Sequence, residues 1–168
     1  MPSELLTERR DATLVLTISE PATRNALSEQ LYAAGIEALT VAESDPGVRA
    51  IVLRGDGATF SAGGNVAGLA ERRRADPSVQ MQLLDRFHEF VEAIRSCPKP
   101  VIAAVEGAAA GGAFSLVLAC DLIVAAEDAR FILSHGRLVC RPTAAVPGSW
   151  RRCCRGRWRC SWSGWPSR

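Results

Sequence analysis

The stretch KPVIAAVEGAAAGGAFSLVLACDLIVAAEDARF, from Lys99 to Phe131, decides the fold of this 168-residue chain. It opens with VIAAVEG, a short apolar run of the kind that forms a buried strand. Small residues and two adjacent glycines follow, and they lead into an apolar helical segment that ends in FSLVLAC. DLIVAAE then predicts another buried strand, and ARFILS is a candidate for one more. Strands that alternate with a helix over so short a span are typical of a parallel sheet with crossover helices.

The upstream sequence has the same alternation. ATLVLTIS (12–19) is rich in β-branched residues and predicts a strand, and VRAIVLRG (48–55) predicts a buried one. Between them, Ser28 is placed to cap a helix that runs through EQLYAAGIEALTVAES (29–44). VQMQLLDRFHEFVEAIRS (79–96) has apolar residues at helical spacing, and the prolines of CPKP end it. We therefore predict an α/β fold with one core domain.

Charge and composition divide the chain after Leu138. Residues 1–138 carry 13 basic and 18 acidic residues, a net charge of −5, whereas residues 139–168 carry seven arginines and no acid, a net charge of +7. The second segment also holds all four tryptophans and four of the six cysteines. No run is apolar enough to span a bilayer, and the N-terminus has no basic-then-apolar signal pattern, so we expect a cytoplasmic protein without a membrane partner.

Two glycine-rich loops are the candidate functional feature. FSAGGN (60–65) and GAAAGGA (107–113) each follow a predicted buried strand and precede a predicted helix. Glycine lets the backbone approach a ligand closely, and a helix N-terminus offers unpaired N–H groups with a partial positive charge. Two such termini that face each other could hold one oxyanion. The alternative is that the glycines only allow tight helix–sheet packing. Neither loop matches the phosphate-binding patterns GxxxxGK[ST] and GxGxxG.

Three segments together resemble the crotonase (enoyl-CoA hydratase/isomerase) superfamily. They are TRNALS (23–28), AIVLRGDGATFSAGGNV (50–66) and the opening stretch from Lys99 to Phe131. The resemblance implies a crotonase-like (Clp/crotonase) spiral of ββα units, here incomplete at the C-terminus. It also implies a substrate that is an acyl-CoA thioester, with coenzyme A as part of the substrate and no separate cofactor or metal. Intact members of this superfamily form homotrimers or hexamers.

The resemblance also assigns site residues. The backbone N–H groups of Gly64 and Gly112 are implied to be the oxyanion-hole donors that stabilise a thioester enolate. Coenzyme A is expected along the loop of residues 24–26 and along Ala62. The expected substrate-binding residues are Arg24, Asn25, Ala26, Ala62, Gly63 and Ser115.

The sequence lacks the catalytic carboxylates that the resemblance would lead one to expect. Hydratases of the superfamily use two glutamates, and the corresponding positions here are Ser115 and His135, so neither carboxylate is present. Because the two carboxylates must position water and move its protons, we expect an enzyme that is impaired and more isomerase-like than hydratase-like. His135 is either a general base or a polar residue that lines the pocket. The alternative function is a non-catalytic CoA-ester or protein-binding remnant. A Clp-type peptidase fits less well, because its nucleophile position falls near Ala110.

Residues 139–168 allow several interpretations. Arginine with tryptophan could bind nucleic acid, the cysteines could bind metal or form disulfides, and the segment could be a poorly ordered basic tail. A frameshift after about Leu138, in the gene or in the reported sequence, explains it best. Read from the third base of the Val139 codon, the codons through Trp150 permit LSPDGGGSW, which resembles the superfamily's turn at this place. Its aspartate, the catalytic residue of some members, would fall between Pro142 and Thr143. We therefore expect no nucleic-acid partner.

Overall fold

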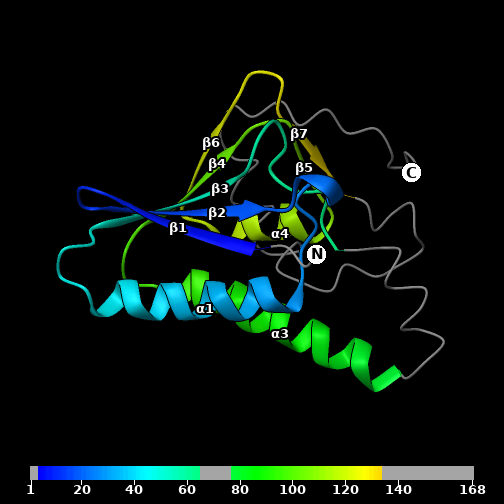
Figure 1. Cartoon of the computed structure of the whole chain (residues 1–168), viewed down its shortest axis with the longest axis horizontal. Helices are drawn as coiled ribbons and strands as arrows, with labels where there is room; N and C mark the ends of the chain where they lie inside the picture. The colour runs from blue at the N-terminus through cyan, green and yellow to red at the C-terminus, as the bar shows by residue number, and fades with distance from the viewer. Residues whose placement is uncertain (1–3, 65–76, 134–168) are drawn as a thin grey trace, which may run out of the picture.

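The computed structural model describes residues 4–64 and 77–133. Figure 1 shows the strands gathered on one side of the long helices α1 and α3. In chain order the elements are β1 (Glu4–Arg10), β2 (Thr13–Ser19), the 3-10 helix η1 (Pro21–Thr23), α1 (Glu29–Ser44), β3 (Ala50–Gly55), α3 (Pro77–Ser96), β4 (Val101–Val105), β5 (Ala108–Ala110), α4 (Gly112–Ala119), β6 (Leu122–Ala125) and β7 (Arg130–Ile132).

Five strands form the main sheet, in the order β1-β2-β3-β4-β6. The strands β2, β3, β4 and β6 are parallel, and β1 pairs with β2 in the antiparallel sense. Helices α1, α3 and α4 lie in the three connections between the parallel strands, which confirms the predicted parallel sheet with crossover helices. The short strands β5 and β7 form a separate parallel pair.

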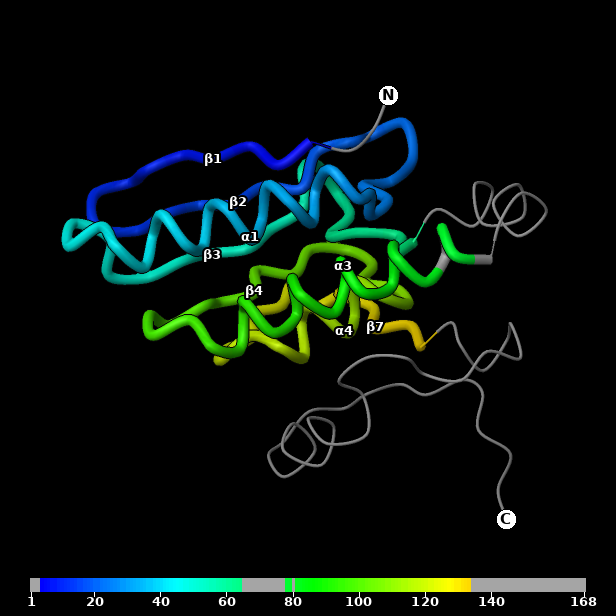
Figure 2. Tube along the Cα trace, turned by 90° about the horizontal axis from the view of Figure 1, so that it is seen from below, coloured from blue at the N-terminus to red at the C-terminus, as the bar shows by residue number. Residues whose placement is uncertain are grey.

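The core lies between the sheet and the helices α1 and α3, which run side by side across one face (Figure 2). The side chains that point from β3 and β4 towards these helices, Ile51, Leu53, Val101 and Ala103, are at most 1% exposed. Gly35 of α1 allows the two helices to approach closely, because a Cβ atom there would lie 2.4 Å from the Phe90 ring of α3. Burial of each large apolar side chain contributes about 1.5–3 kcal/mol, so this layer stabilises the sheet.

The strand β6 differs from its prediction. We expected DLIVAAE to be buried, but Leu122 and Val124 are 59% and 63% exposed. Ile123 and Ala125 point the other way and pack against the core. Within the described ranges β6 is an edge strand with β4 as its only neighbour in the sheet, and no helix there covers the face that carries Leu122 and Val124 (Figure 1).

Two strands were not predicted. The sequence of β1, ELLTERR, is charged and almost wholly exposed, so it has no clear apolar alternation. It pairs with β2 through a tight turn at Asp11, whose φ is 52°. The strand β5 consists of three alanines that we assigned to the second glycine-rich loop, and α4 begins at Gly112.

The predicted helix over residues 29–44 is confirmed at both ends. The Ser28 hydroxyl accepts a hydrogen bond from the Leu31 N–H at 3.3 Å, which is the expected N-cap. At the other end, the Lys99 ammonium donates to the carbonyls of Ala42 and Asp45. A cation is favourable at a helix C-terminus, so Lys99 ties the end of α1 to the segment that enters β4.

Cys97 and Cys120 are free thiols that pack against the core, in agreement with their prediction as small hydrophobic residues. The Cys120 thiol donates to the Leu116 carbonyl at 3.3 Å. Burial, with a smaller contribution from the Asp121 charge, raises the pKa of Cys120 to about 12. The predicted domain boundary after Leu138 lies outside the described residues.

Candidate functional site

The first glycine loop runs beside the second and is hydrogen-bonded to it. The Phe60 N–H donates to the Glu106 carbonyl at 2.8 Å. One residue later, the Ser61 N–H donates to the Ala108 carbonyl at 3.0 Å, and the Ser61 carbonyl accepts from the Ala110 N–H at 3.0 Å. These bonds extend the β5–β7 pair by one short parallel bridge, so the loops that follow β3 and β4 are held in a fixed register.

The loops approach most closely at Gly63. This residue has a φ of +84°, and a Cβ atom on it would lie 2.4 Å from the Ala110 carbonyl oxygen and 3.3 Å from the Gly112 nitrogen. Only glycine combines this backbone conformation with so close a contact. The contact places the backbone just before Gly64 against the first residue of α4, so the two predicted donor residues lie close together.

The amides of Gly64 and Gly112 differ from those beside them. The Gly63 N–H donates to the Ser61 hydroxyl at 3.1 Å, and the Gly111 N–H donates to the Ile132 carbonyl at 2.8 Å. Within residues 4–64 and 77–133, neither the Gly64 N–H nor the Gly112 N–H donates a hydrogen bond. Gly112 is the first residue of α4, where N–H groups lack intrahelical partners and the helix dipole favours negative charge. Two such donors can stabilise one oxyanion.

The loop before α1 completes the site's backbone. The Leu27 N–H donates to the Gly63 carbonyl at 2.9 Å, and the Ala62 N–H donates to the Arg24 carbonyl at 2.9 Å. The structure thus brings together Arg24, Ala26 and Ala62, which the sequence assigned to one binding surface. Arg24 and Ala62 are exposed and Ala26 is half-buried, so these three residues are open to a ligand.

Asn25 is placed differently from its neighbours. It is 1% exposed, and its side-chain amide donates to the carbonyls of Asp56 at 2.9 Å and Thr59 at 2.7 Å. Its side-chain oxygen accepts from the Glu20 N–H at 3.0 Å. The φ of Asn25 is 57°, a left-handed conformation that asparagine tolerates better than most residues. Its side chain therefore fixes the two loops and has no free group to offer a ligand.

Ser61 is a site residue that the sequence did not reveal. It is fully buried, and its hydroxyl donates to the Asn25 carbonyl at 2.6 Å while it accepts from the Gly63 N–H. One hydroxyl thus connects the loop before α1 to the glycine turn. The available signal was a serine two residues before a glycine, since short polar side chains often bond to nearby backbone at turns.

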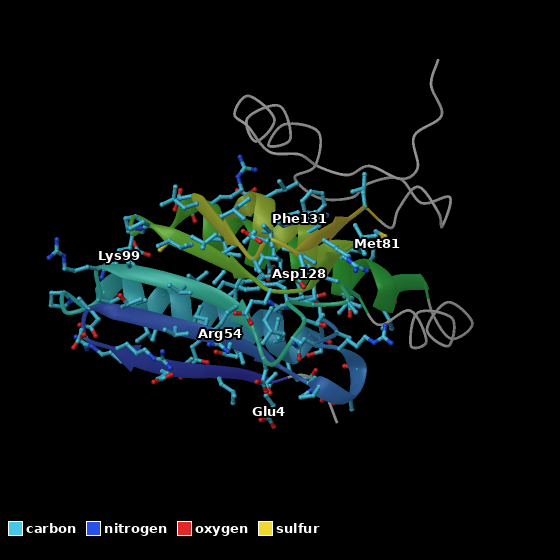
Figure 3. The ribbon with its side chains drawn as sticks, turned by 90° about the horizontal axis from the view of Figure 1, so that it is seen from above. Glu4, Arg54, Met81, Lys99, Asp128 and Phe131 are labelled. Atoms are coloured by element: carbon cyan, nitrogen blue, oxygen red, sulfur yellow. The ribbon has the colours of Figure 1, made fainter. Side chains whose placement is uncertain are left out.

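Ser115 lies on α4, three residues after Gly112. It is 1% exposed, and its Oγ is the one buried side-chain oxygen or nitrogen in the described part of the chain that has no hydrogen-bond partner. The residue before it, Phe114, packs on Phe131 of β7 with ring centroids 5.5 Å apart (Phe131 is labelled in Figure 3). Ser115 therefore lies within one turn of the predicted donor Gly112, on a helix that packs against β7.

The remaining predicted site residue, His135, lies outside the described residues. Across residues 4–64 and 77–133, no cluster of three or more His, Cys, Asp or Glu side chains is arranged to hold a metal ion. Among the helices in those same ranges, none combines the length and apolar composition needed to cross a membrane.

Comparison with known proteins places this chain in one family. The family model for enoyl-CoA hydratase/isomerase matches residues 8–154. A probable enoyl-CoA hydratase of Bacillus subtilis is 40% identical over 116 residues, which are 69% of this chain and 44% of that protein. The 2,3-dehydroadipyl-CoA hydratase of Escherichia coli is 35% identical over 142 residues, which are 84% of this chain and 54% of that protein.

A solved structure shows the same likeness in three dimensions. The crystal structure of an enoyl-CoA hydratase from Polaromonas sp. JS666 superposes with a TM-score of 0.81 at 50% sequence identity. The superposition covers 82% of this chain and 54% of that one. The chain thus spans about half the length of the proteins it matches.

Proposed function

The chain belongs to the enoyl-CoA hydratase/isomerase family and has the crotonase fold, and from this premise we propose that it binds an acyl-CoA thioester. The Gly64 and Gly112 amides hold the thioester carbonyl oxygen and stabilise the enolate that forms from it. The main support for the proposal is the close contact of Gly63 with the backbone of Ala110 and Gly112. It joins two loops, and the N–H groups of Gly64 and Gly112 at their ends have no acceptor within the described residues.

The chemistry follows from how the charge develops. When a proton leaves the carbon next to a thioester, negative charge accumulates on the carbonyl oxygen. Fixed N–H donors stabilise that oxygen more than they stabilise the neutral carbonyl, and each donor of this kind contributes about 3–4 kcal/mol in the transition state. The bonds that Ser61 makes to Asn25 and Gly63 hold the first donor loop in place before the substrate arrives.

Coenzyme A lies, in this proposal, along the exposed surface formed by Arg24, Ala26 and Ala62. The side chain of Asn25 holds the backbone of that surface and does not contact the ligand, because its hydrogen-bonding atoms are already engaged. The acyl group then extends past Gly64 and Gly112 towards α4.

We further propose that hydration is impaired in this chain. Ser115 offers a hydroxyl where hydratases of the family are expected to have a carboxylate, and a hydroxyl cannot act as a general base near neutral pH. A chain that binds the thioester without turning it over is the second candidate function, and the absence of a carboxylate at Ser115 favours it. Crotonyl-CoA turnover separates the two, and loss of activity in His135→Ala would identify a hydratase that uses this histidine.

A paired substitution at Gly112 tests the donor directly. Gly112→Pro deletes the N–H at the first position of a helix, where proline is tolerated. Gly112→Ala keeps the N–H, and its added Cβ would meet only ordinary contacts of 3.5 Å with Leu27 and Phe87.

By calorimetry, we expect Gly112→Pro to weaken butyryl-CoA binding about 2- to 10-fold, the value of one hydrogen bond to a neutral carbonyl. Gly112→Ala should bind like the native chain, and free coenzyme A should bind all three proteins equally. Equal butyryl-CoA affinities for the proline and alanine variants would contradict the proposal.

A further inference from the structure

Lys99 is the only lysine in the sequence, because the other basic residues of the Lys and Arg set are all arginines. It lies in the connection between α3 and β4, two residues before β4 begins at Val101. The glycine loops follow the opposite ends of β3 and β4, so Lys99 is at the end of the sheet away from the candidate site. Figure 3 shows it at the other end of the molecule from Met81.

The Lys99 ammonium closes the C-terminus of α1. It donates hydrogen bonds to the carbonyls of Ala42 at 2.5 Å and Asp45 at 2.6 Å. The last carbonyls of a helix have no intrahelical donor, and the helix dipole favours a positive charge beside them. The side chain of Asp45 extends the same junction, since its carboxylate accepts from Arg9 at 3.0 Å and from the Gly47 N–H at 2.7 Å. One cation thus joins the end of α1 to the start of β4.

This junction depends on chemistry that an acyl group would remove. The ammonium carries one positive charge and three N–H donors, two of which are used here. An acylated lysine is a neutral amide with one N–H, so it can serve at most one of the two carbonyls. Acylation also cancels the favourable interaction of the charge with the helix dipole. A carbonyl of Ala42 or Asp45 would then lose its donor.

The amine can be reached when the end of α1 opens. Lys99 is half-buried, and the residues on either side of it, Pro98 and Pro100, are exposed. Helix ends open locally at much lower cost than the core of a domain. Opening of the last turn of α1 frees the amine for reaction, and an acyl group added at that moment prevents the junction from closing as before.

We propose that Lys99 is an acylation site at which an acyl-CoA thioester lowers the stability of the fold. The unprotonated amine attacks the thioester carbonyl, a C–N bond forms, the C–S bond breaks, and coenzyme A leaves as the thiol with the proton that the nitrogen loses. The thioester reacts from solution at the far end of the sheet, so the inference is independent of the proposed oxyanion site. Its consequence is a protein that becomes less stable as acyl-CoA accumulates.

The experiment exposes the native chain and Lys99→Arg to acetyl-CoA at pH 8, with free coenzyme A as the blank. Peptide mass spectrometry locates the acetyl groups, and thermal unfolding compares treated with untreated protein. We expect acetylation at Lys99 and a melting temperature about 5 °C or more below that of the untreated native chain. Lys99→Arg keeps the charge and the donors but does not form the amide, so acetyl-CoA should leave its melting temperature unchanged. Acetylation of the N-terminal amine is common to both proteins and cancels in the comparison.

A pair of variants tests the junction without the reaction. Lys99→Gln carries an uncharged amide and should melt about 5 °C or more below the native chain. Arg95→Gln removes the same charge from an exposed position on α3, where its ion pair with Glu92 contributes little, and should shift the melting temperature by less than about 2 °C.

Two results would overturn the inference. One is a native chain whose N-terminal amine is acetylated while Lys99 stays unmodified. The other is a chain acetylated at Lys99 that melts like the untreated protein. Either result leaves the proposed function intact, because butyryl-CoA binding at the glycine loops is measured separately.

Discussion

The two sides of the candidate site differ in whether their buried polar side chains are hydrogen-bonded. On the side of the first glycine loop, Asn25 and Ser61 are buried and connect the loops through bonds of 2.6–3.1 Å. On the side of α4, Ser115 is as deeply buried and has no partner. The bonded side chains of Asn25 and Ser61 fix the loops relative to each other. The Ser115 hydroxyl makes no such connection.

The largest loss of stability is expected from a substitution at Gly63, where the first glycine loop contacts the start of α4. Gly63→Ala forces a side chain into a positive φ and against the Ala110 carbonyl, so we expect it to lower the free energy of unfolding by more than about 3 kcal/mol. Urea denaturation measures this. Gly64→Ala is the matched control, because nothing lies within 4 Å of its added Cβ. Similar stability of the two variants would mean that the loops do not approach each other as described.

Asn25→Ala should have the next largest effect. It leaves the carbonyls of Asp56 and Thr59 and the N–H of Glu20 without their partner, and we expect a loss of about 2–4 kcal/mol in unfolding free energy. Asn25→Asp keeps the acceptor for Glu20 but removes the two donors, so its loss should be substantial as well. A native-like urea midpoint for the aspartate variant would show that the donor bonds do not hold the loops.

Ser61→Ala should cost less, about 1–2 kcal/mol, because it removes one hydroxyl and leaves only the Asn25 carbonyl and the Gly63 N–H to find other partners. Ser44→Ala, at an exposed helical position, should change stability by less than about 0.5 kcal/mol. If the two variants unfold at the same urea concentration, Ser61 has no structural role.

Ser115→Ala should give the smallest effect and the opposite sign. Removal of an unsatisfied hydroxyl together with better helix propensity should raise the unfolding free energy by up to about 1 kcal/mol. Thermal unfolding of Ser61→Ala and Ser115→Ala in one buffer makes the comparison direct. A loss of stability in Ser115→Ala like that in Ser61→Ala would remove the distinction between the two sides of the site.

The sequence predicted the helices and strands whose apolar residues are bounded by a recognisable cap, glycine or proline. The helix over residues 29–44 had a cap at Ser28, and the runs over residues 48–55 and 101–107 were apolar and ended at glycine. The strand β1 was missed because its charged residues leave no apolar alternation, and it exists through pairing with β2. The exposed face of β6 was missed because an apolar run does not show whether one face or both are covered.

The close approach of the two glycine loops could be predicted from the sequence, but the side-chain hydrogen bonds around them could not. Paired glycines indicated close approach, and the contact of Gly63 with Ala110 and Gly112 agrees with that. The bonds made by Ser61 and the burial of the Asn25 side chain depend on how distant segments meet, so no local pattern contains them. The prediction for His135 falls outside the described residues and stays a prediction.

The most direct test of the central claim is a titration followed at the amides of Gly64 and Gly112 by nuclear magnetic resonance. If these amides hold the thioester oxygen, butyryl-CoA should shift both proton signals downfield, and free coenzyme A, which has no thioester, should leave both in place. The Gly111 amide, already bonded to Ile132, is the internal control and should move little with either ligand. Butyryl-CoA binding that leaves the Gly64 and Gly112 signals unmoved would contradict the account.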